Sequence, residues 1–132
     1  GMFVTMIVGV YDKNKNDLLL SNAGHEPPLI FSKDGNFKTI DEAGPPLGIA
    51  PNFKFTEQTI SFKESSMYIF TDGITEMKNN NGEMLGQEGF KDYIKKYQST
   101  HNNKRLQKMI EDLIGSGRIQ KDDLTIVTVD GK

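Results

Sequence analysis

The stretch from residue 67 to residue 76 reads Met67-Tyr68-Ile69-Phe70-Thr71-Asp72-Gly73-Ile74-Thr75-Glu76. Its four leading apolar residues predict a buried strand, and Asp72-Gly73 predicts a turn where that strand ends. A second acidic stretch, Lys121-Asp122-Asp123-Leu124-Thr125-Ile126-Val127, puts two carboxylates immediately before a predicted strand over Leu124–Val129. Carboxylate oxygens at strand ends suit hard cations such as Mg²⁺ or Mn²⁺. Both stretches therefore indicate a metal site.

Upstream of residue 67 the sequence predicts antiparallel β structure. Apolar runs over Phe3–Tyr11 and Leu18–Ala23 flank a polar turn, which is the pattern of a hairpin. A second hairpin is predicted from Pro28–Phe31 to Phe37–Ile40, because Asp34-Gly35 lies between them. Phe53–Phe62 alternates apolar and polar residues, which predicts one long half-buried strand.

Beyond Gly86 the apolar period changes from two residues to that of a helix. Two stripes follow, the first of Phe90, Tyr93, Ile94 and Tyr97, the second of Leu106, Met109, Ile110, Leu113 and Ile114. Gly115-Ser116-Gly117 gives the stop signal for the second helix. The predicted class is α+β, a layered domain of antiparallel strands, two helices and a final strand.

Composition excludes several classes of function. A chain of 132 residues is enough for one domain, and a formal net charge of -2 with scattered Lys and Arg argues against nucleic acid as a partner. The chain has no cysteine, which excludes disulfides and thiol catalysis. No apolar run approaches the roughly 20 residues that span a bilayer, so we expect no membrane partner and a cytoplasmic protein. Gly1 before Met2 is interpreted as a scar of tag removal.

Six short segments, in order along nearly the whole chain, carry a family resemblance. They are Phe3-Val4-Thr5-Met6, Asn22-Ala23-Gly24-His25-Glu26-Pro27-Pro28-Leu29, Pro46-Leu47-Gly48-Ile49, Phe70-Thr71-Asp72-Gly73-Ile74-Thr75-Glu76, Gly82-Glu83-Met84-Leu85-Gly86 and Asp122-Asp123-Leu124-Thr125. Together they resemble the SpoIIE-type branch of the metal-dependent serine/threonine protein phosphatases, the bacterial relatives of protein phosphatase 2C. The resemblance implies a sandwich of two antiparallel sheets with flanking helices and a two-metal site.

The resemblance implies that Asp72 and Asp122 are metal ligands. In such a centre two Mn²⁺ or Mg²⁺ ions activate a bound water that attacks phosphorus, so no protein nucleophile is expected. Asp123 is the alternative ligand to Asp122, or its hydrogen-bonded neighbour. The implied substrate is phosphoserine or phosphothreonine on a regulatory protein, such as an anti-sigma-factor antagonist.

The chain departs from the family pattern at its beginning. Family members carry an earlier Asp-x-x-Gly-[His/Lys]-Gly motif whose aspartate bridges both metals, and nothing before Phe3 supplies it. Residues 2–132 are therefore expected to be the C-terminal portion of a phosphatase domain that lacks its N-terminal strands and helices. We expect the chain alone to be inactive, and its uncovered sheet edges to recruit a companion N-terminal segment or a second copy.

Several residues near these motifs admit two interpretations. His25 is either a ligand of metal or phosphate or a loop residue held by a hydrogen bond. Thr71 and Thr75 either orient an aspartate or complete the end of a strand, and Glu76 is either a partner of the site or an exposed carboxylate. Residues 78–83 form either a flap over the substrate or a solvated loop.

Two functions from different classes follow from the sequence. The first is a metal-dependent protein phosphatase whose remaining ligands come from elsewhere. The second is a non-catalytic, phosphatase-like module for interaction or oligomerisation, which would tolerate loss of the Asp72 carboxylate.

Overall fold

The predicted hairpin at the start of the chain is present in the computed structural model, which describes residues 1–40 and 43–131. Strand β1 (Met6–Asp12) pairs antiparallel with β2 (Asp17–Ala23), with Gly9 opposite Leu20. Asp12 shapes the turn, because its Oδ1 accepts the backbone N–H groups of Asn14 at 2.9 Å and Lys15 at 3.2 Å. These hydrogen bonds hold the pKa of Asp12 below its ordinary value.

The second predicted hairpin is also confirmed. Strand β3 (Leu29–Ser32) pairs antiparallel with β4 (Phe37–Thr39) around Asp34-Gly35, and Gly35 has the positive φ of 85° that this turn requires. The register puts Phe31 opposite Phe37, and their ring centroids lie 4.7 Å apart.

The predicted long strand over residues 53–62 is only partly correct, because β5 spans Gln58–Ser61. It pairs with β2, and the pairing begins at Gln58 opposite Leu20. The residues before it do not join the ladder. The rings of Phe53 and Phe55 contact each other edge to face at 5.0 Å. A Cβ on Gly44 would lie 2.6 Å from the Phe55 ring, so the aromatic pair packs on a bare glycine backbone.

The strands form two sheets, and the class is α+β as predicted. One sheet has the order β1-β2-β5, and the other has the order β4-β3-β6-β7, with β6 at Ser65–Phe70 and β7 at Ile126–Asp130. The chain divides into two compact units, Gly1–Ile69 with Val129–Lys132 and Phe70–Thr128, and each is described by itself.

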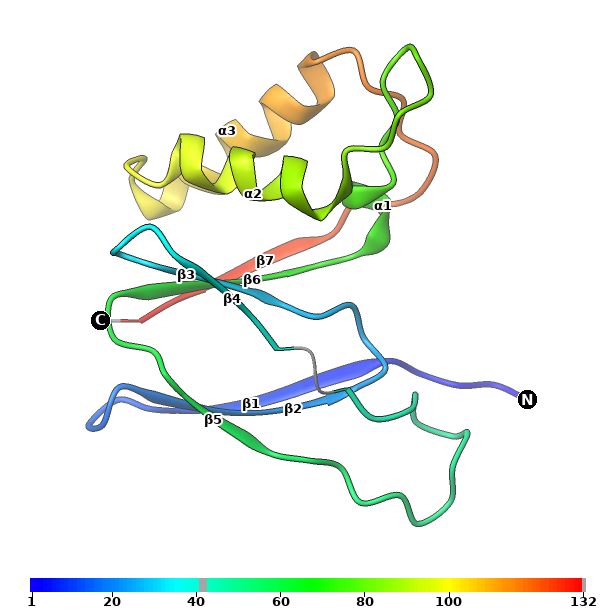
Figure 1. The fold of residues 1–132 in the computed structure, drawn as a ribbon, viewed down its shortest axis with the longest axis vertical. Helices are drawn as coiled ribbons and strands as arrows, with labels where there is room; N and C mark the ends of the chain where they lie inside the picture. The colour runs from blue at the N-terminus through cyan, green and yellow to red at the C-terminus, as the bar shows by residue number, and fades with distance from the viewer. Residues whose placement is uncertain (41–42, 132) are drawn as a thin grey trace. The chain divides into compact units, whose positions relative to one another are not determined.

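In the first unit the two sheets face each other as a sandwich, as Figure 1 shows for β1, β2 and β5 against β3 and β4. The core between them consists of the buried residues Leu18, Leu20, Ile30, Ile40, Phe62 and Met67. Ile7 and Tyr11 of β1 pack against this core, whereas Val8 and Val10 point the other way and are 54% and 64% exposed. The outer side of β1 is therefore apolar and uncovered within the described chain.

The second unit holds three helices: α1 (Asp72–Thr75), α2 (Gly86–Tyr97) and α3 (Asn102–Gly115). Members of both predicted stripes pack inward, and Phe90, Ile94, Met109 and Leu113 are fully buried. The prediction is wrong for Ile114, which is 55% exposed at the end of α3. Asp112 of α3 accepts hydrogen bonds from Lys96 Nζ at 2.6 Å and Tyr97 Oη at 2.9 Å, which joins the two helices. Among the helices described, none is long and apolar enough to cross a membrane.

Candidate metal centre

Asp72 lies where a buried strand gives way to a short helix. Strand β6 ends at Phe70, Thr71 is extended (φ -93°, ψ 157°), and Asp72 is the first residue of α1 with an exposed side chain. The backbone carbonyl of Asp72 accepts the Glu76 N–H at 2.8 Å and the Thr75 hydroxyl at 3.2 Å. Thr75 therefore stabilises the turn of α1 through the backbone of Asp72, and the Asp72 carboxylate projects into solvent.

Asp122 and Asp123 lie in the connection between α3 and β7. The strand begins at Ile126, so the prediction of a strand from Leu124 is wrong by two residues at its start. Asp122 Oδ1 accepts the backbone N–H of Asp123 at 2.8 Å, and Gln120 Nε2 donates to the Asp122 carbonyl at 2.9 Å. Both carboxylates are exposed, and one oxygen of Asp122 is held by the peptide that follows it.

Three hydrogen bonds at Thr71 bring the two acidic stretches together. The Thr71 N–H donates to the Thr125 carbonyl at 3.1 Å, and the Thr125 N–H donates back to Thr71 Oγ1 at 3.1 Å. The Thr71 hydroxyl also donates to the Asp123 carbonyl at 3.2 Å. Residues more than 50 positions apart in the chain are thus joined directly beside Asp72. We call this set of contacts the Thr71 junction.

Gly73 allows the two stretches to approach closely. A Cβ built at Gly73 would lie 2.4 Å from the Asp123 carbonyl oxygen and 3.5 Å from the Asp122 carbonyl oxygen. Real Cβ atoms do not come as close as 2.4 Å to another heavy atom. Gly73 is buried and lies inside α1, so its role is to provide space rather than a positive φ. Only glycine leaves room for the Asp122-Asp123 backbone at this position.

The donor chemistry of the junction fits a divalent metal. Asp72 and Asp122 provide anionic oxygens on adjoining backbone segments, and oxygen is the ligand atom that Mg²⁺ and Mn²⁺ prefer. Within the part of the chain that the structure describes, no group of three or more His, Cys, Asp or Glu side chains is arranged to hold a metal ion. Asp72 and Asp122 are thus two exposed carboxylates on backbone segments that the Thr71 junction joins.

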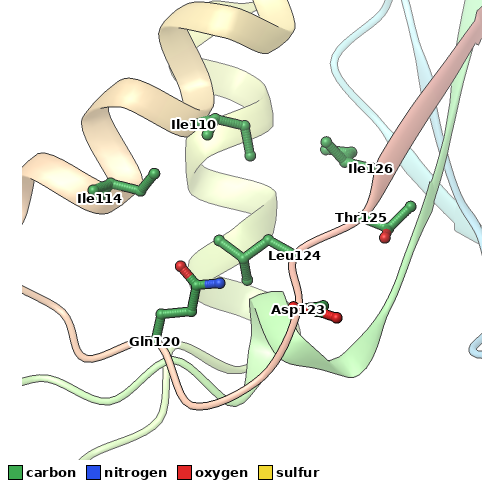
Figure 2. A pocket seen from close by; sticks show the side chains of 7 residues that line it. All are labelled: Ile110, Ile114, Gln120, Asp123, Leu124, Thr125 and Ile126. Carbon is green, nitrogen blue, oxygen red and sulfur yellow. The ribbon is translucent and has the colours of Figure 1, made fainter.

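A groove opens beside the second acidic stretch, between α3 and residues 120–126. Its volume is about 680 Å³, and it is lined by Ile110, Ile114, Gln120, Asp123, Leu124, Thr125 and Ile126. Figure 2 shows Ile110 and Ile114 reaching from α3 toward Leu124, with Asp123 on the adjoining backbone. The groove therefore places an apolar surface next to the carboxylates.

The segment around His25, in the first unit, is a hydrogen-bonded loop. The Asn22 side chain is buried, donates to the His25 carbonyl at 3.0 Å and accepts the His25 N–H at 2.9 Å. His25 Nδ1 lies 2.9 Å from the Glu26 carbonyl, so this nitrogen carries the proton that makes the bond. A Cβ on Gly24 would lie 2.6 Å from the Pro46 ring, which explains why a glycine is needed there. The hydrogen-bonded interpretation of His25 therefore has direct structural support.

Residues 78–83, interpreted above as either a flap or a solvated loop, form a turn that is closed by hydrogen bonds. Asn79 Oδ1 accepts the N–H groups of Asn81 and Glu83, both at 3.0 Å. Lys78 and Ile119 exchange two backbone hydrogen bonds, of 2.8 and 3.3 Å, which tie this turn to the segment that leads to Asp122. The sequence shows the Asn and Gly of the turn, but it contains no signal for its pairing with Ile119.

The contribution of Thr71 was left open by the sequence, and Thr125 was not singled out. Thr71 follows one predicted strand and Thr125 lies near the start of another, each beside an acidic motif, and this position was the available signal. Threonine at a strand end is common, so the signal alone does not distinguish a junction from an ordinary β residue.

Comparison with known proteins gives a consistent result. Residues 1–132 match the family described as Stage II sporulation protein E (SpoIIE). Protein IcfG of Synechocystis sp. is 32% identical over 131 residues, covering 97% of this chain and 20% of IcfG. Phosphoserine phosphatase RsbU of Bacillus subtilis is 26% identical, covering 97% of this chain and 39% of RsbU.

The fold is also found in solved structures. The crystal structure of the RsbU and RsbW domains of Rv1364c from Mycobacterium tuberculosis aligns with a TM-score of 0.78 at 22% identity, covering 97% of this chain and 36% of that chain. This chain therefore spans between a fifth and two fifths of the length of these three relatives.

Proposed function

The chain belongs to the SpoIIE family of protein phosphatase 2C-like domains, and from this membership we propose that it is part of a metal-dependent protein serine/threonine phosphatase. Residues 2–132 are assigned to the C-terminal portion of the phosphatase domain, with Gly1 left outside it. The similarity to a protein named phosphoserine phosphatase, over 97% of this chain, supports the proposed phosphatase activity.

In this proposal Asp72 and Asp122 are ligands of Mn²⁺ or Mg²⁺. The observation that carries it is the Thr71 junction, which joins the backbones on which the two carboxylates stand. When bound, divalent ions supply Lewis acidity toward a phosphate ester and stabilise the charge that develops on its oxygens. The Asp123 N–H orients the Asp122 carboxylate, and Gly73 leaves the space that keeps the two segments together.

The proposed substrate is phosphoserine or phosphothreonine on a regulatory protein, such as an anti-sigma-factor antagonist. The names of two relatives support this class, one a phosphoserine phosphatase and the other a chain with RsbU and RsbW domains. The exposed carboxylates of Asp72, Asp122 and Asp123 repel a phosphate dianion at short range, so phosphate binding requires the metal.

The chain alone is proposed to be inactive. Mg²⁺ and Mn²⁺ bind about six ligand oxygens, so two aspartates leave most of the coordination positions to other donors. A companion N-terminal segment would supply them, and the apolar outer side of β1, with Val8 and Val10 exposed, provides a surface for its attachment.

The second candidate is a non-catalytic module that associates through β1. It is favoured by the same exposed strand, because a strand at the edge of a sheet with exposed apolar side chains is prone to pairing with another chain. This function needs neither aspartate.

Hydrolysis of p-nitrophenyl phosphate with Mn²⁺ separates the two candidates. The chain is assayed alone and with an added N-terminal segment from a family member that carries the Asp-x-x-Gly-[His/Lys]-Gly motif. We expect turnover only in the mixture, with loss of activity in Asp72→Asn and Asp122→Asn. Asp123→Asn is the matched control, since it keeps the backbone N–H and carbonyl that the junction uses. Full activity in Asp72→Asn and Asp122→Asn would refute the proposed ligands, and inactivity of every mixture would favour the module.

A further inference from the structure

The hydroxyl of Thr71 makes hydrogen bonds that the main-chain pairing of two strand ends does not require. The Thr71 N–H and the Thr125 carbonyl already form a main-chain hydrogen bond at 3.1 Å. The partner for the Thr125 N–H is then the Thr71 side chain instead of a backbone carbonyl. The same hydroxyl donates its proton to the Asp123 carbonyl, two residues closer to Asp122.

These contacts form a continuous connection between the two candidate ligands. Thr71 is covalently next to Asp72, and its Oγ1 lies 3.2 Å from the Asp123 carbonyl oxygen. The peptide N–H of Asp123 in turn holds Asp122 Oδ1 at 2.8 Å. Gly73 closes on the same Asp123 carbonyl from the other motif, which limits how far that peptide moves. Only one residue, Asp123, lies between the Thr71 hydroxyl and the Asp122 carboxylate.

We propose that Thr71 is a positioning residue whose hydroxyl joins the Asp122 segment to the start of α1 and so fixes the two carboxylates relative to each other. The proposal rests on the proposed function, in which Asp72 and Asp122 bind a divalent metal. In this role Thr71 would need no contact with the metal or the substrate. It acts through the backbone of Asp123 and Thr125, as residues behind metal ligands do when they restrict ligand orientation.

Two substitutions at Thr71 separate the hydroxyl from the bulk of the side chain. Thr71→Val keeps the shape and removes both hydroxyl hydrogen bonds, whereas Thr71→Ser keeps the hydroxyl. Thr75→Val is the matched control, because the Thr75 hydroxyl also lies beside Asp72 but donates only to the Asp72 carbonyl within α1. A general loss of α1 stability would appear in both valine variants, and a positioning effect appears only at Thr71.

The first measurement is amide hydrogen exchange of the 132-residue chain by NMR, without metal. The Thr125 amide should exchange roughly 2- to 10-fold faster in Thr71→Val, the range expected for one lost hydrogen bond, and at the wild-type rate in Thr71→Ser and Thr75→Val. An unchanged Thr125 rate in Thr71→Val would overturn the proposed hydrogen bond.

The second measurement is a titration with Mn²⁺ alone, followed by paramagnetic broadening of the backbone signals of residues 72 and 122. We expect affinity to fall about tenfold or more in Thr71→Val and to be restored in Thr71→Ser. If Thr71→Val shows the same broadening and the same Mn²⁺ affinity as the wild-type chain, the role of Thr71 is overturned and the proposed ligands stand. Absence of broadening at both residues in the wild-type chain, even with the added N-terminal segment, would overturn the proposed metal ligands and, with them, this inference.

Discussion

The outer side of β1 and the Thr71 junction differ in how much of each is covered by neighbouring residues of the described chain. On β1, Val8 and Val10 are more than half exposed within the described chain. At the junction the backbones approach so closely that no Cβ fits on Gly73. The first is a surface open to another segment, and the second is complete within its own unit. Substitutions at the two places should therefore affect different properties.

The largest expected effect sharpens the contrast between the inner and outer sides of the first hairpin. Leu20→Ala on β2 removes a side chain that is 2% exposed in the sandwich core, and should reduce the free energy of unfolding by about 2 to 5 kcal/mol. Its neighbour Leu19 is 37% exposed, and Leu19→Ala should cost clearly less. Guanidinium denaturation measures both. Equal costs would show that the outer side is covered in solution.

The second prediction concerns the close packing at the Thr71 junction. Gly73→Ala puts a methyl group 2.4 Å from the Asp123 carbonyl oxygen, so the two segments must separate. We expect a loss of about 1 to 3 kcal/mol, as in other overpacked sites, together with loss of the Mn²⁺-induced broadening at residues 72 and 122. Gly115→Ala is the control, since nothing lies within 4 Å of its Cβ position in α3 and the change favours the helix. A Gly73→Ala variant with wild-type stability would contradict the packing described here.

A third prediction tests the open region without unfolding it. Val10→Lys places a charge on the exposed side of β1 and should abolish self-association while leaving the melting temperature nearly unchanged. Thr59→Lys, an exposed site on β5 at the opposite edge of the same sheet, is the matched control. Size-exclusion chromatography with light scattering over a range of concentrations gives the mass. A wild-type chain that is monomeric throughout would exclude self-association and leave the companion segment.

The smallest effect concerns the pH dependence of the α2–α3 pairing in the second unit. The hydrogen bond from Lys96, followed by that from Tyr97, lowers the pKa of Asp112, and the bond to Asp112 raises the pKa of Lys96. The stability that Asp112 contributes is therefore present above its pKa in the unfolded chain. It is lost as pH falls through its pKa in the folded chain, below about pH 4. The Lys96 contribution is present at neutral pH and is lost as pH rises through a folded pKa above about 10.

Melting temperatures followed by circular dichroism across this range should show a small decline at each end. The decline is small because the Lys96 and Asp112 side chains are 59% and 33% exposed, so water and salt screen the pair. Asp112→Asn should remove the part of the acid decline that depends on this pair. An acid decline of equal size in Asp112→Asn would assign it to other carboxylates.

The local elements were predictable because their causes are local. Asp34-Gly35 supplies the turn geometry of its hairpin within two residues, and the stripes of α2 and α3 follow from spacing along one helix. The prediction of a strand over residues 53–57 was wrong, because pairing with β2 stops at Gln58 although the apolar alternation continues before it. A strand requires a partner ladder, and alternation does not indicate where that ladder ends.

The sequence by itself determined the class of the fold, the family resemblance and the two aspartates worth testing, since these follow from residue types, short-range spacing and ordered motifs. Only the tertiary structure decided that Gly73 packs on the Asp123 carbonyl, that the Thr71 hydroxyl bridges the Asp122 segment and that one side of β1 is open. The physical reason is that hydrogen bonds and steric contacts between residues some 50 positions apart depend on how the backbone returns, and an Asp-Gly pair or a strand-end threonine has the same local preferences wherever it occurs.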